Sequence, residues 1–168
     1  MERVDFRTAK NIKGDYESLI DHMWRYWYAM RFIRGKKVID AACGTGYGSL
    51  MMGWGAETVT GLDINISHTR PSGLNVRFAQ ADFNKDTLPK ADVCVSFETI
   101  EHLEEPGYFL KELRCKELVF SIPLDMPSQF HKRSYKEEDI KELLEDTGWN
   151  LIENDIQDHK YFYGRAIR

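Results

Sequence analysis

A glycine-rich loop follows an apolar stretch and an acid in VIDAACGTGYGS, which begins at Val38. Its glycines are Gly44, Gly46 and Gly48. Glycines at this spacing let the backbone turn sharply into a helix and approach a ligand closely. The G-x-G-x-x-G frame of dinucleotide-binding loops does not fit, because a frame that starts at Gly44 ends on Ser49. Asp40, just before the loop, would repel a pyrophosphate but attract an ammonium or sulfonium group. The loop therefore predicts a ligand that is cationic at this point.

Two further acids end apolar stretches, Asp63 in TVTGLDI and Asp82 in AQADF. Asp63 is in place to accept hydrogen bonds from both hydroxyls of a ribose. Asp82 can accept a hydrogen bond from an adenine amine while Phe83 lies against the ring. Three acids at three successive strand ends around a glycine loop describe a pocket for an adenosine without phosphates and with a positive charge. S-adenosylmethionine matches that description.

Carboxylate and imidazole groups recur in FETIEHL and FHKRSY. Glu98, Glu101 and His102 are spaced i, i+3 and i+4, which puts them on one face of a helical turn, and His131 could reach the same edge. Imidazoles have a pKa of about 6.5, which suits proton removal from a hydroxyl acceptor. We predict Glu98, His102 and His131 as catalytic residues, with Glu98 or Glu101 orienting the base.

These residues must be positioned by an alternation of strands and helices. The apolar pattern predicts helices at 17–33, 46–53, 106–114 and 136–146, and strands at 37–41, 58–63, 76–81, 91–97 and 117–122, followed by an antiparallel pair at 150–157 and 160–167. Apolar strands separated by helices indicate a doubly wound α/β fold with a mostly parallel seven-stranded sheet and an antiparallel C-terminal strand. Only eleven residues separate Asp63 from Asn75, so we expect the second crossover helix to be reduced.

The first predicted helix carries apolar side chains at helical spacing, which predicts a face that packs onto the rest of the domain. The residues of this expected face are Leu19, Ile20, Met23, Trp24, Trp27 and Tyr28. The same apolar helix is where we would expect a homodimer contact, which would complete a substrate pocket in so short a chain.

The 168 residues predict a single domain, with an N-terminal helical segment at 1–35 and a cofactor-binding core at 36–168. With 42% apolar and 30% charged residues, a charged N-terminus and no long apolar run, we expect a soluble, cytoplasmic chain without membrane contact. Its three cysteines are few and far apart, which favours reduced thiols. A net charge of −4 disfavours nucleic acid as a partner, although His131, Lys132 and Arg133 form a local basic patch.

The ordered set VIDAACGTGYGS, GLDI, AQADF, ADVCVSFETIEHLEEP and LVFSIP resembles the class I S-adenosylmethionine-dependent methyltransferases. The resemblance implies a Rossmann-like fold and S-adenosylmethionine as cofactor. It implies that Asp40, Ala42, Gly44 and Gly46 surround the methionine part, Asp63 the ribose and Asp82 with Phe83 the adenine, with Ile64 in the cofactor-binding set and Glu98 beside the transferred methyl. The chain departs from the family at Ala42, where glycine is common, and in RCKEL, which replaces a glycine-rich turn before the fifth core strand.

The resemblance implies a methyltransferase, and the chain lacks the Asn/Asp-Pro-Pro-aromatic motif of enzymes that methylate amino groups. We therefore expect O-methylation of a small-molecule or glycan acceptor. One alternative is a metal-assisted RNA 2′-O-methyltransferase, since the small-RNA 3′-terminal enzymes space their metal ligands as Glu98, Glu101, His102 and His131. Such a set suits Mn²⁺ or Mg²⁺ with open positions for two hydroxyls, but the E-x-x-E-H tract is commoner in metal-free relatives, so a metal is not favoured. The other alternative is a catalytically inactive cofactor-binding protein, because the chain has no obvious insertion to cap a substrate.

Overall fold

A computed structural model describes residues 15–69 and 75–168, with side chains from Leu19 onward. Residues 1–14 of the predicted N-terminal helical segment lie outside this described part. The strands are β1 (Lys37–Ala41), β2 (Thr58–Asp63), β3 (Val76–Gln80), β4 (Val93–Phe97), β5 (Glu117–Pro123), β6 (Asn150–Gln157) and β7 (Tyr161–Ile167). The helices are α1 (Asp15–Ala29), α2 (Tyr47–Met52), the 3₁₀ turn η1 (Ile100–His102), α3 (Pro106–Glu112) and α4 (Glu137–Asp146).

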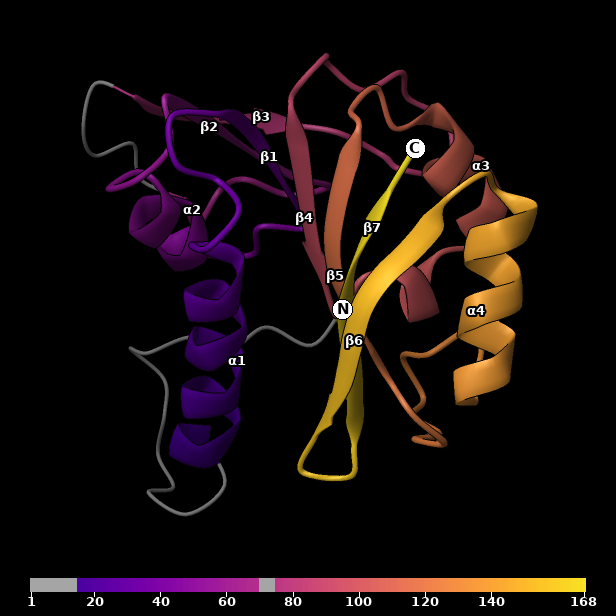
Figure 1. The fold of residues 1–168 in the computed structure, drawn as a ribbon. Helices are drawn as coiled ribbons and strands as arrows, with labels where there is room; N and C mark the ends of the chain where they lie inside the picture. The colour runs from indigo at the N-terminus through magenta and orange to yellow at the C-terminus, as the bar shows by residue number, and fades with distance from the viewer. Residues whose placement is uncertain (1–14, 70–74) are drawn as a thin grey trace.

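The strands form one seven-stranded sheet in the order β3-β2-β1-β4-β5-β7-β6 (Figure 1). Neighbours among β1 to β5 pair in parallel, and β7 lies antiparallel between β5 and β6. This arrangement confirms the predicted Rossmann-like, doubly wound and mostly parallel sheet with its antiparallel C-terminal strand. The carboxyl ends of the five parallel strands therefore meet at one edge, where ligands bind in folds of this kind.

Helices cover both faces of the sheet, with α1 and α2 on one side and α3 and α4 on the other (Figure 1). Side chains alternate along β1, so Val38 packs with Tyr26 under α1, whereas Ile39 packs with Phe109 under α3. The same alternation turns Asp40 toward α1 and α2. A carboxylate in a buried strand is thus placed between the sheet and the first two helices.

The connection from β2 to β3 contains no helix in its described residues 64–69, whereas 70–74 lie outside the described part. The expected reduction of the second crossover helix is confirmed for the described residues. None of the helices in residues 15–69 and 75–168 combines the length and apolarity that crossing a membrane requires.

The expected packing face of α1 is wrong for four of its six residues, since Leu19 and Tyr28 are buried but Ile20, Met23, Trp24 and Trp27 are exposed. Ile20 and Trp27 are 63% and 65% exposed, whereas Leu19, Tyr26 and Ala29 are buried. Apolarity alone placed the tryptophans inside, but this helix buries polar side chains that contact the sheet's carboxyl edge. The buried face of α1 therefore contributes to a candidate site at the carboxyl edge of the sheet as well as to the hydrophobic core.

Candidate functional site

The glycine loop joins β1 to α2 and turns through three left-handed residues, Ala42, Gly44 and Gly46, whose φ angles are 59°, 57° and 85°. A Cβ atom built on Gly44 would meet no described atom within 4 Å. A Cβ on Gly46 would lie 2.6 Å from the Phe78 ring, and one on Gly48 would lie 2.0 Å from the Tyr26 ring. Of these three glycines, Gly44 is the one beside which the described residues leave space, while Gly46 and Gly48 make room for aromatic side chains of the protein itself.

Ala42 and Glu98 are among five residues with side chains in the described chain that hold backbone conformations favouring glycine. Ala42 keeps the left-handed conformation at the position where the resembled family commonly has glycine, and Glu98 at the end of β4 has φ 50°. Such a conformation costs a residue with a Cβ atom about 1–2 kcal/mol. Both residues border the carboxyl edge of the sheet, where backbone strain of this kind often accompanies a binding site.

Asp63 fastens the loop after β1 to the loop after β2. Its carboxylate accepts hydrogen bonds from the backbone N–H of Gly44, at 2.9 Å, and of Asn65, at 3.0 Å. The Asp63 side chain is buried, and the neighbouring Ile64 is 53% exposed at the rim. Asp63, the residue predicted to bind the ribose, thus also holds the glycine loop in place.

Asp82 follows β3 and accepts hydrogen bonds from the Asn84 backbone N–H at 3.0 Å, and its ion pair with Lys85 spans 3.0 Å. The contact with Lys85, which has the larger effect, and the hydrogen bond from Asn84 both lower the pKa of the Asp82 carboxyl. Phe83 is buried and packs at 5.3 Å, ring centre to ring centre, on Phe109 of α3. Asp82 therefore stands at the rim, whereas the Phe83 ring belongs to the core under α3.

Asp40 lies beneath α1 with no exposed surface. Its carboxylate accepts hydrogen bonds from the Ser49 hydroxyl at 2.5 Å and from the Tyr26 hydroxyl at 3.1 Å. Burial raises the pKa of Asp40 to about 7, against the opposing effect of the two hydroxyl donors and with a smaller contribution from the charge of Asp63. This acid therefore changes its ionisation near neutral pH.

Helix α1 also contributes two buried ionisable side chains that the sequence analysis did not identify. Arg25 is 1% exposed, donates from Nη1 to the Gln157 side-chain oxygen at 2.8 Å and stacks at 4.4 Å over the Tyr161 ring. His22 Nδ1 lies 2.7 Å from the Tyr47 hydroxyl, and burial, with the nearby Arg25 charge, lowers the pKa of His22 to about 3. The sequence did contain a signal for them, because His22 and Arg25 are three residues apart, the same spacing that drew attention to Glu98 and Glu101.

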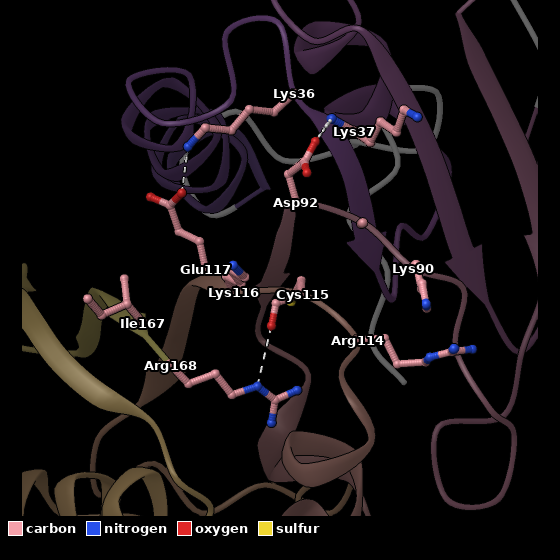
Figure 2. Close-up of a pocket in the computed structure, with 11 residues that line it drawn as sticks. Lys36, Lys37, Lys90, Asp92, Arg114, Cys115, Lys116, Glu117, Ile167 and Arg168 are labelled. Carbon is pink, nitrogen blue, oxygen red and sulfur yellow. Dashed lines mark hydrogen bonds and ion pairs between the residues drawn. The ribbon is translucent and has the colours of Figure 1, made fainter.

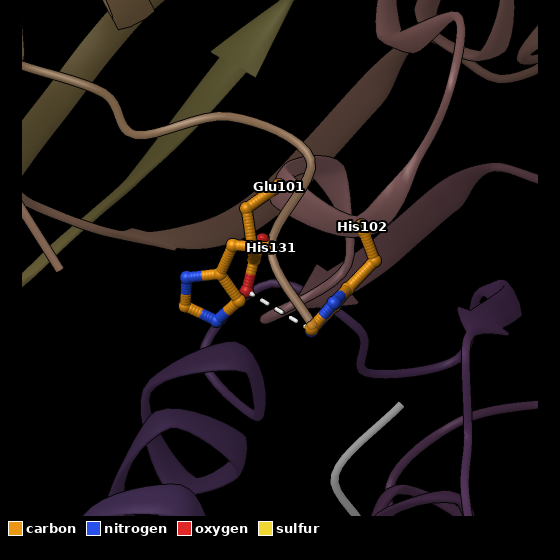
Figure 3. Close-up of side chains that lie close together, drawn as sticks. All are labelled: Glu101, His102 and His131. Carbon is orange, nitrogen blue, oxygen red and sulfur yellow. Dashed lines mark ion pairs between the residues drawn. The ribbon is translucent and has the colours of Figure 1, made fainter. Parts of the chain in front are cut away.

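The later cluster brings Glu101, His102 and His131 together, as Figure 3 shows. One ligand atom from each lies within 4.8 Å of the others, and His102 Nε2 is 3.6 Å from Glu101 Oε1. Each imidazole is held by its other nitrogen, because His102 Nδ1 donates to the Phe130 carbonyl at 2.9 Å and His131 Nδ1 to the Met126 carbonyl at 2.7 Å. These contacts orient both rings.

Glu101 has no exposed surface, and within the described chain neither of its carboxylate oxygens has a hydrogen-bond partner. Burial, and then the charge of Glu98, raises the pKa of Glu101 well above its ordinary value. Glu98 itself accepts a hydrogen bond from the Ser121 hydroxyl at 2.8 Å and is not among the three clustered ligands. Burial raises the pKa of Glu98, and the positive charge of Arg25 opposes this effect. Three of the four predicted metal-ligand candidates are therefore gathered, with Glu98 beside them.

A cavity lies at the edge of the sheet opposite the glycine loop, by the amino ends of β1 and β5 (Figure 2). One of its basic side chains, Lys36, forms a 2.6 Å ion pair with Glu117. The backbone N–H of Lys37 donates to Asp92 at 2.8 Å. This cavity is separated from the glycine loop by the length of the strands, and it supports the junction between β1, β5 and β7.

Comparison with known proteins bears on this arrangement. Residues 39–115 match a family model described as "Methyltransferase domain". The chain is 32% identical over 136 residues to a Mycolicibacterium smegmatis protein named "Probable S-adenosylmethionine-dependent methyltransferase", covering 70% of this chain and 53% of that protein. It is 33% identical over 89 residues to the ubiquinone biosynthesis O-methyltransferase of Pseudomonas fluorescens, covering 47% of this chain and 38% of that enzyme. The crystal structure of magnesium protoporphyrin IX methyltransferase from Synechocystis PCC 6803 with bound SAH is similar with a TM-score of 0.68 and 20% identity, covering 91% of this chain and 83% of that one.

The sheet order, with an acid and a glycine loop after its first strand, defines a Rossmann-like domain of the kind that binds a nucleoside cofactor at its carboxyl edge. Residues 39–115 match the methyltransferase domain model, and the chain is similar to S-adenosylmethionine-dependent methyltransferases. It spans about half the length of the curated relatives it matches.

Proposed function

We propose that this chain transfers the methyl group of S-adenosylmethionine to a hydroxyl oxygen of a small-molecule or glycan acceptor. The observation that carries the proposal is that one sheet edge holds both the Gly44 loop, fastened by Asp63, and the cluster of Glu101, His102 and His131. The first group suits the cofactor and the second suits a hydroxyl acceptor. Similarity to an enzyme named for O-methylation in ubiquinone biosynthesis supports oxygen as the acceptor atom.

The cofactor would lie along the carboxyl ends of β1, β2 and β3. Its methionine part would contact the loop at Gly44, where the structure leaves space, with Asp40 close behind as a negative charge. One carboxylate oxygen of Asp63 accepts the Gly44 N–H and the other accepts the Asn65 N–H, and a ribose hydroxyl would donate to the same carboxylate. Because Asp63 is buried, we expect the loop that begins at Ile64 to shift when the ribose enters. The adenine would then reach the rim at Asp82.

In the transfer step, the acceptor oxygen attacks the methyl carbon and the bond from that carbon to sulfur breaks, with its electron pair staying on sulfur as the thioether of S-adenosylhomocysteine. The hydroxyl proton needs an acceptor, and His102 or His131 can take it. Both rings keep their Nδ1 proton on a backbone carbonyl, so the lone pair of the neutral ring is on Nε2. Glu98, fixed by Ser121, would border the transferred methyl.

Calorimetry with S-adenosylhomocysteine tests the cofactor site. We expect saturable binding to the wild-type chain and a loss of affinity of about tenfold or more in Asp63→Asn, since each hydrogen bond to a charged acceptor is worth about 1.5–3 kcal/mol. Asp92→Asn is a matched control, because Asp92 also accepts a backbone N–H but at the opposite edge of the sheet. Thermal unfolding of each variant confirms that it folds. A folded wild-type chain that gives no binding heat at millimolar ligand would refute the proposal.

A further inference from the structure

We infer that the cavity at the amino ends of β1 and β5 binds a small oligophosphate anion, a molecule that carries two or more adjacent phosphoryl groups. The cavity has a volume of about 810 Å³. Sites for small molecules usually have volumes of about 300–1,000 Å³. The cavity lies at the sheet edge opposite the glycine loop (Figure 2), so the oligophosphate site is independent of the proposed function.

Positive charge is concentrated around this cavity. Although the chain carries a net charge of −4, the lining of the cavity includes only two acids, Asp92 and Glu117. Its six cationic residues are Lys36, Lys37, Lys90, Arg114, Lys116 and Arg168. Even when a carboxyl group at the end of the chain is counted, the lining keeps an excess of positive charge, which attracts anions.

The two acids do not neutralise this excess. The Glu117 carboxylate pairs with Lys36 at 2.6 Å and also with Arg165, which lies outside the cavity lining. Asp92 accepts a hydrogen bond from the backbone N–H of Lys37 at 2.8 Å, and this donor carries no charge. The acids of the lining are therefore already engaged, one of them by a cation from outside the cavity.

Three cations of the lining have no acidic partner in the described part of the chain, namely Lys90, Arg114 and Lys116. Lys90 and Arg114 lie directly across a parallel backbone bridge from each other (Figure 2). Like charges at directly paired positions are destabilising, and natural proteins accept such local costs mainly at functional sites. An anion that contacts both side chains would remove their repulsion.

Arg114 and Lys116 flank Cys115 in the turn that leads into β5. This turn is part of the RCKEL segment, which replaces the glycine-rich turn of the resembled family. Glycines would supply no side chain to a ligand, whereas this turn places two exposed cations at the cavity, with the buried Cys115 between them. The anion site therefore rests on residues by which this chain departs from the resembled family.

A structural role is the competing explanation, because the carbonyls at the end of a helix carry partial negative charge and attract cations. Arg168 fills this role for α3, since its Nη1 donates to the carbonyls of Leu110 and Lys111 at 3.3 and 3.4 Å. Its guanidinium also lies 4.4 Å from the centre of the Trp149 ring. The Arg114 side chain makes no such contact in the described chain, so the end of α3 accounts for Arg168 and leaves Arg114 to a ligand.

The lining also indicates which anion fits. The Arg114 guanidinium can donate two parallel hydrogen bonds to one phosphoryl group, and the two lysines supply point charges for its neighbours. No aromatic side chain is among the lining residues of the described chain. Single-stranded nucleic acids are usually bound by stacking of their bases on aromatic rings. Recognition should therefore rest on adjacent phosphoryl groups and ignore any base attached to them.

The test is calorimetry of the purified full chain with sodium tripolyphosphate, in magnesium-free buffer of low ionic strength. We expect one site per chain and an affinity that falls as salt is added. ATP and GTP should bind within about threefold of each other, because the cavity offers no ring to their bases. Inorganic phosphate should bind at least about tenfold more weakly than tripolyphosphate, because it reaches fewer of the cations. Equal affinity for phosphate and tripolyphosphate would contradict an oligophosphate site.

The double variant Lys90→Gln/Arg114→Gln should bind tripolyphosphate more than about tenfold more weakly than wild type, because it loses charge-assisted hydrogen bonds. Lys141→Gln/Lys160→Gln is the matched control, because it removes the same charge at exposed positions on α4 and in the β6–β7 turn. Thermal unfolding followed by circular dichroism confirms that both variants fold. Equal weakening in the two double variants would overturn the proposal, because the net charge of the chain would then explain the binding.

The glycine loop is the other place where a nucleotide could bind. Saturation with S-adenosylhomocysteine, and separately Asp63→Asn, should leave the affinity for tripolyphosphate unchanged, and loss of affinity in either experiment would overturn the amino-edge site. Binding of a single-stranded RNA without binding of tripolyphosphate would also overturn it, in favour of a nucleic-acid surface. Tripolyphosphate binding requires no cofactor, so failure of the anion site and failure of the proposed methyl transfer are separate results.

Discussion

Replacing Asp40 by Asn should stabilise the protein relative to wild type at pH 8 and far less at pH 5. The carboxyl is fully buried, and its pKa is raised from 3.8 to about 7 in the fold. Between these values the folded chain binds a proton that the unfolded chain does not. The stability from Asp40 is therefore fully present below pH 3.8 and is lost as pH rises through about 7. Asn is neutral at every pH and can keep both hydroxyl contacts, because the Ser49 or Tyr26 oxygen can accept from its amide.

The size of the effect follows from the pKa shift. From pH 5 to pH 8 the folded Asp40 passes through about two pKa units in which it holds the extra proton, and each unit is worth 1.36 kcal/mol, so wild type loses about 2.7 kcal/mol. His22 acts in the opposite direction, since its pKa is lowered from 6.5 to about 3. Its contribution is present above pH 6.5 and is lost as pH falls toward 3, which is about 2 kcal/mol between pH 6.5 and pH 5. The two effects largely cancel in wild type.

Urea unfolding of wild type and Asp40→Asn at four pH values from about 5 to about 8 measures the difference directly. The difference in free energy of unfolding should grow by about 2.7 kcal/mol across this range, most steeply below pH 7. His22→Gln should change in the other direction: it lacks the His22 contribution that offsets Asp40, so its stability should fall by about 2 kcal/mol between pH 5 and pH 6.5, where wild type stays nearly level. A difference between Asp40→Asn and wild type that stays constant with pH would refute the reasoning, because it would mean that Asp40 ionises alike in the folded and unfolded chains.

Two further predictions concern the cofactor loop. Gly44→Ala should fold with a loss of about 1–2 kcal/mol of stability, because its backbone is left-handed. It should bind S-adenosylhomocysteine more than about tenfold more weakly in calorimetry, because the new Cβ enters the space that the described residues leave at Gly44. Normal affinity would place the cofactor elsewhere. Gly46→Ala is the contrasting variant, and its melting temperature should fall further, because its Cβ would lie 2.6 Å from the Phe78 ring. The affinity for S-adenosylmethionine relative to S-adenosylhomocysteine should rise with pH through about 7 as Asp40 ionises, and a ratio that competition calorimetry finds constant would show that Asp40 does not sense the sulfonium.

The sheet could be predicted from the sequence because its strands are short apolar runs with clear ends. Strands β1 and β2 and the first strand of the closing hairpin, β6, have the predicted bounds, and the others differ by a few residues at their ends. The parallel pairing follows from connections too long for a hairpin, two of which contain helices: α2 lies between β1 and β2, and α3 lies between β4 and β5. Acids at strand ends then had to share one edge. Asp63 illustrates this, because its contact with Gly44 joins residues that are nineteen apart in the chain.

The role of each glycine could not be predicted from spacing. Gly44, Gly46 and Gly48 look equivalent in the sequence, but the rings of Phe78 and Tyr26 occupy the space beside the last two. Tyr26 comes from α1 and Phe78 from β3, so these contacts depend on the tertiary fold. A glycine pattern predicts where the backbone turns, and the packing decides which glycine is left for a ligand.

The face of α1 was mispredicted for a related reason, and the correction links the two halves of the site. Apolar spacing favoured the side that carries Trp27, yet the helix buries Arg25, which reaches Gln157 at the far end of the chain. Arg25 places a positive charge near Glu98 and Glu101, opposing the rise in pKa that burial causes in both. From the next position, Tyr26 donates to Asp40 beside the glycine loop. One turn of α1 thus contacts the acid behind the cofactor loop and places a positive charge beside Glu98 and Glu101, so displacement of this helix should disturb the cofactor side and the acceptor side of the proposed site together.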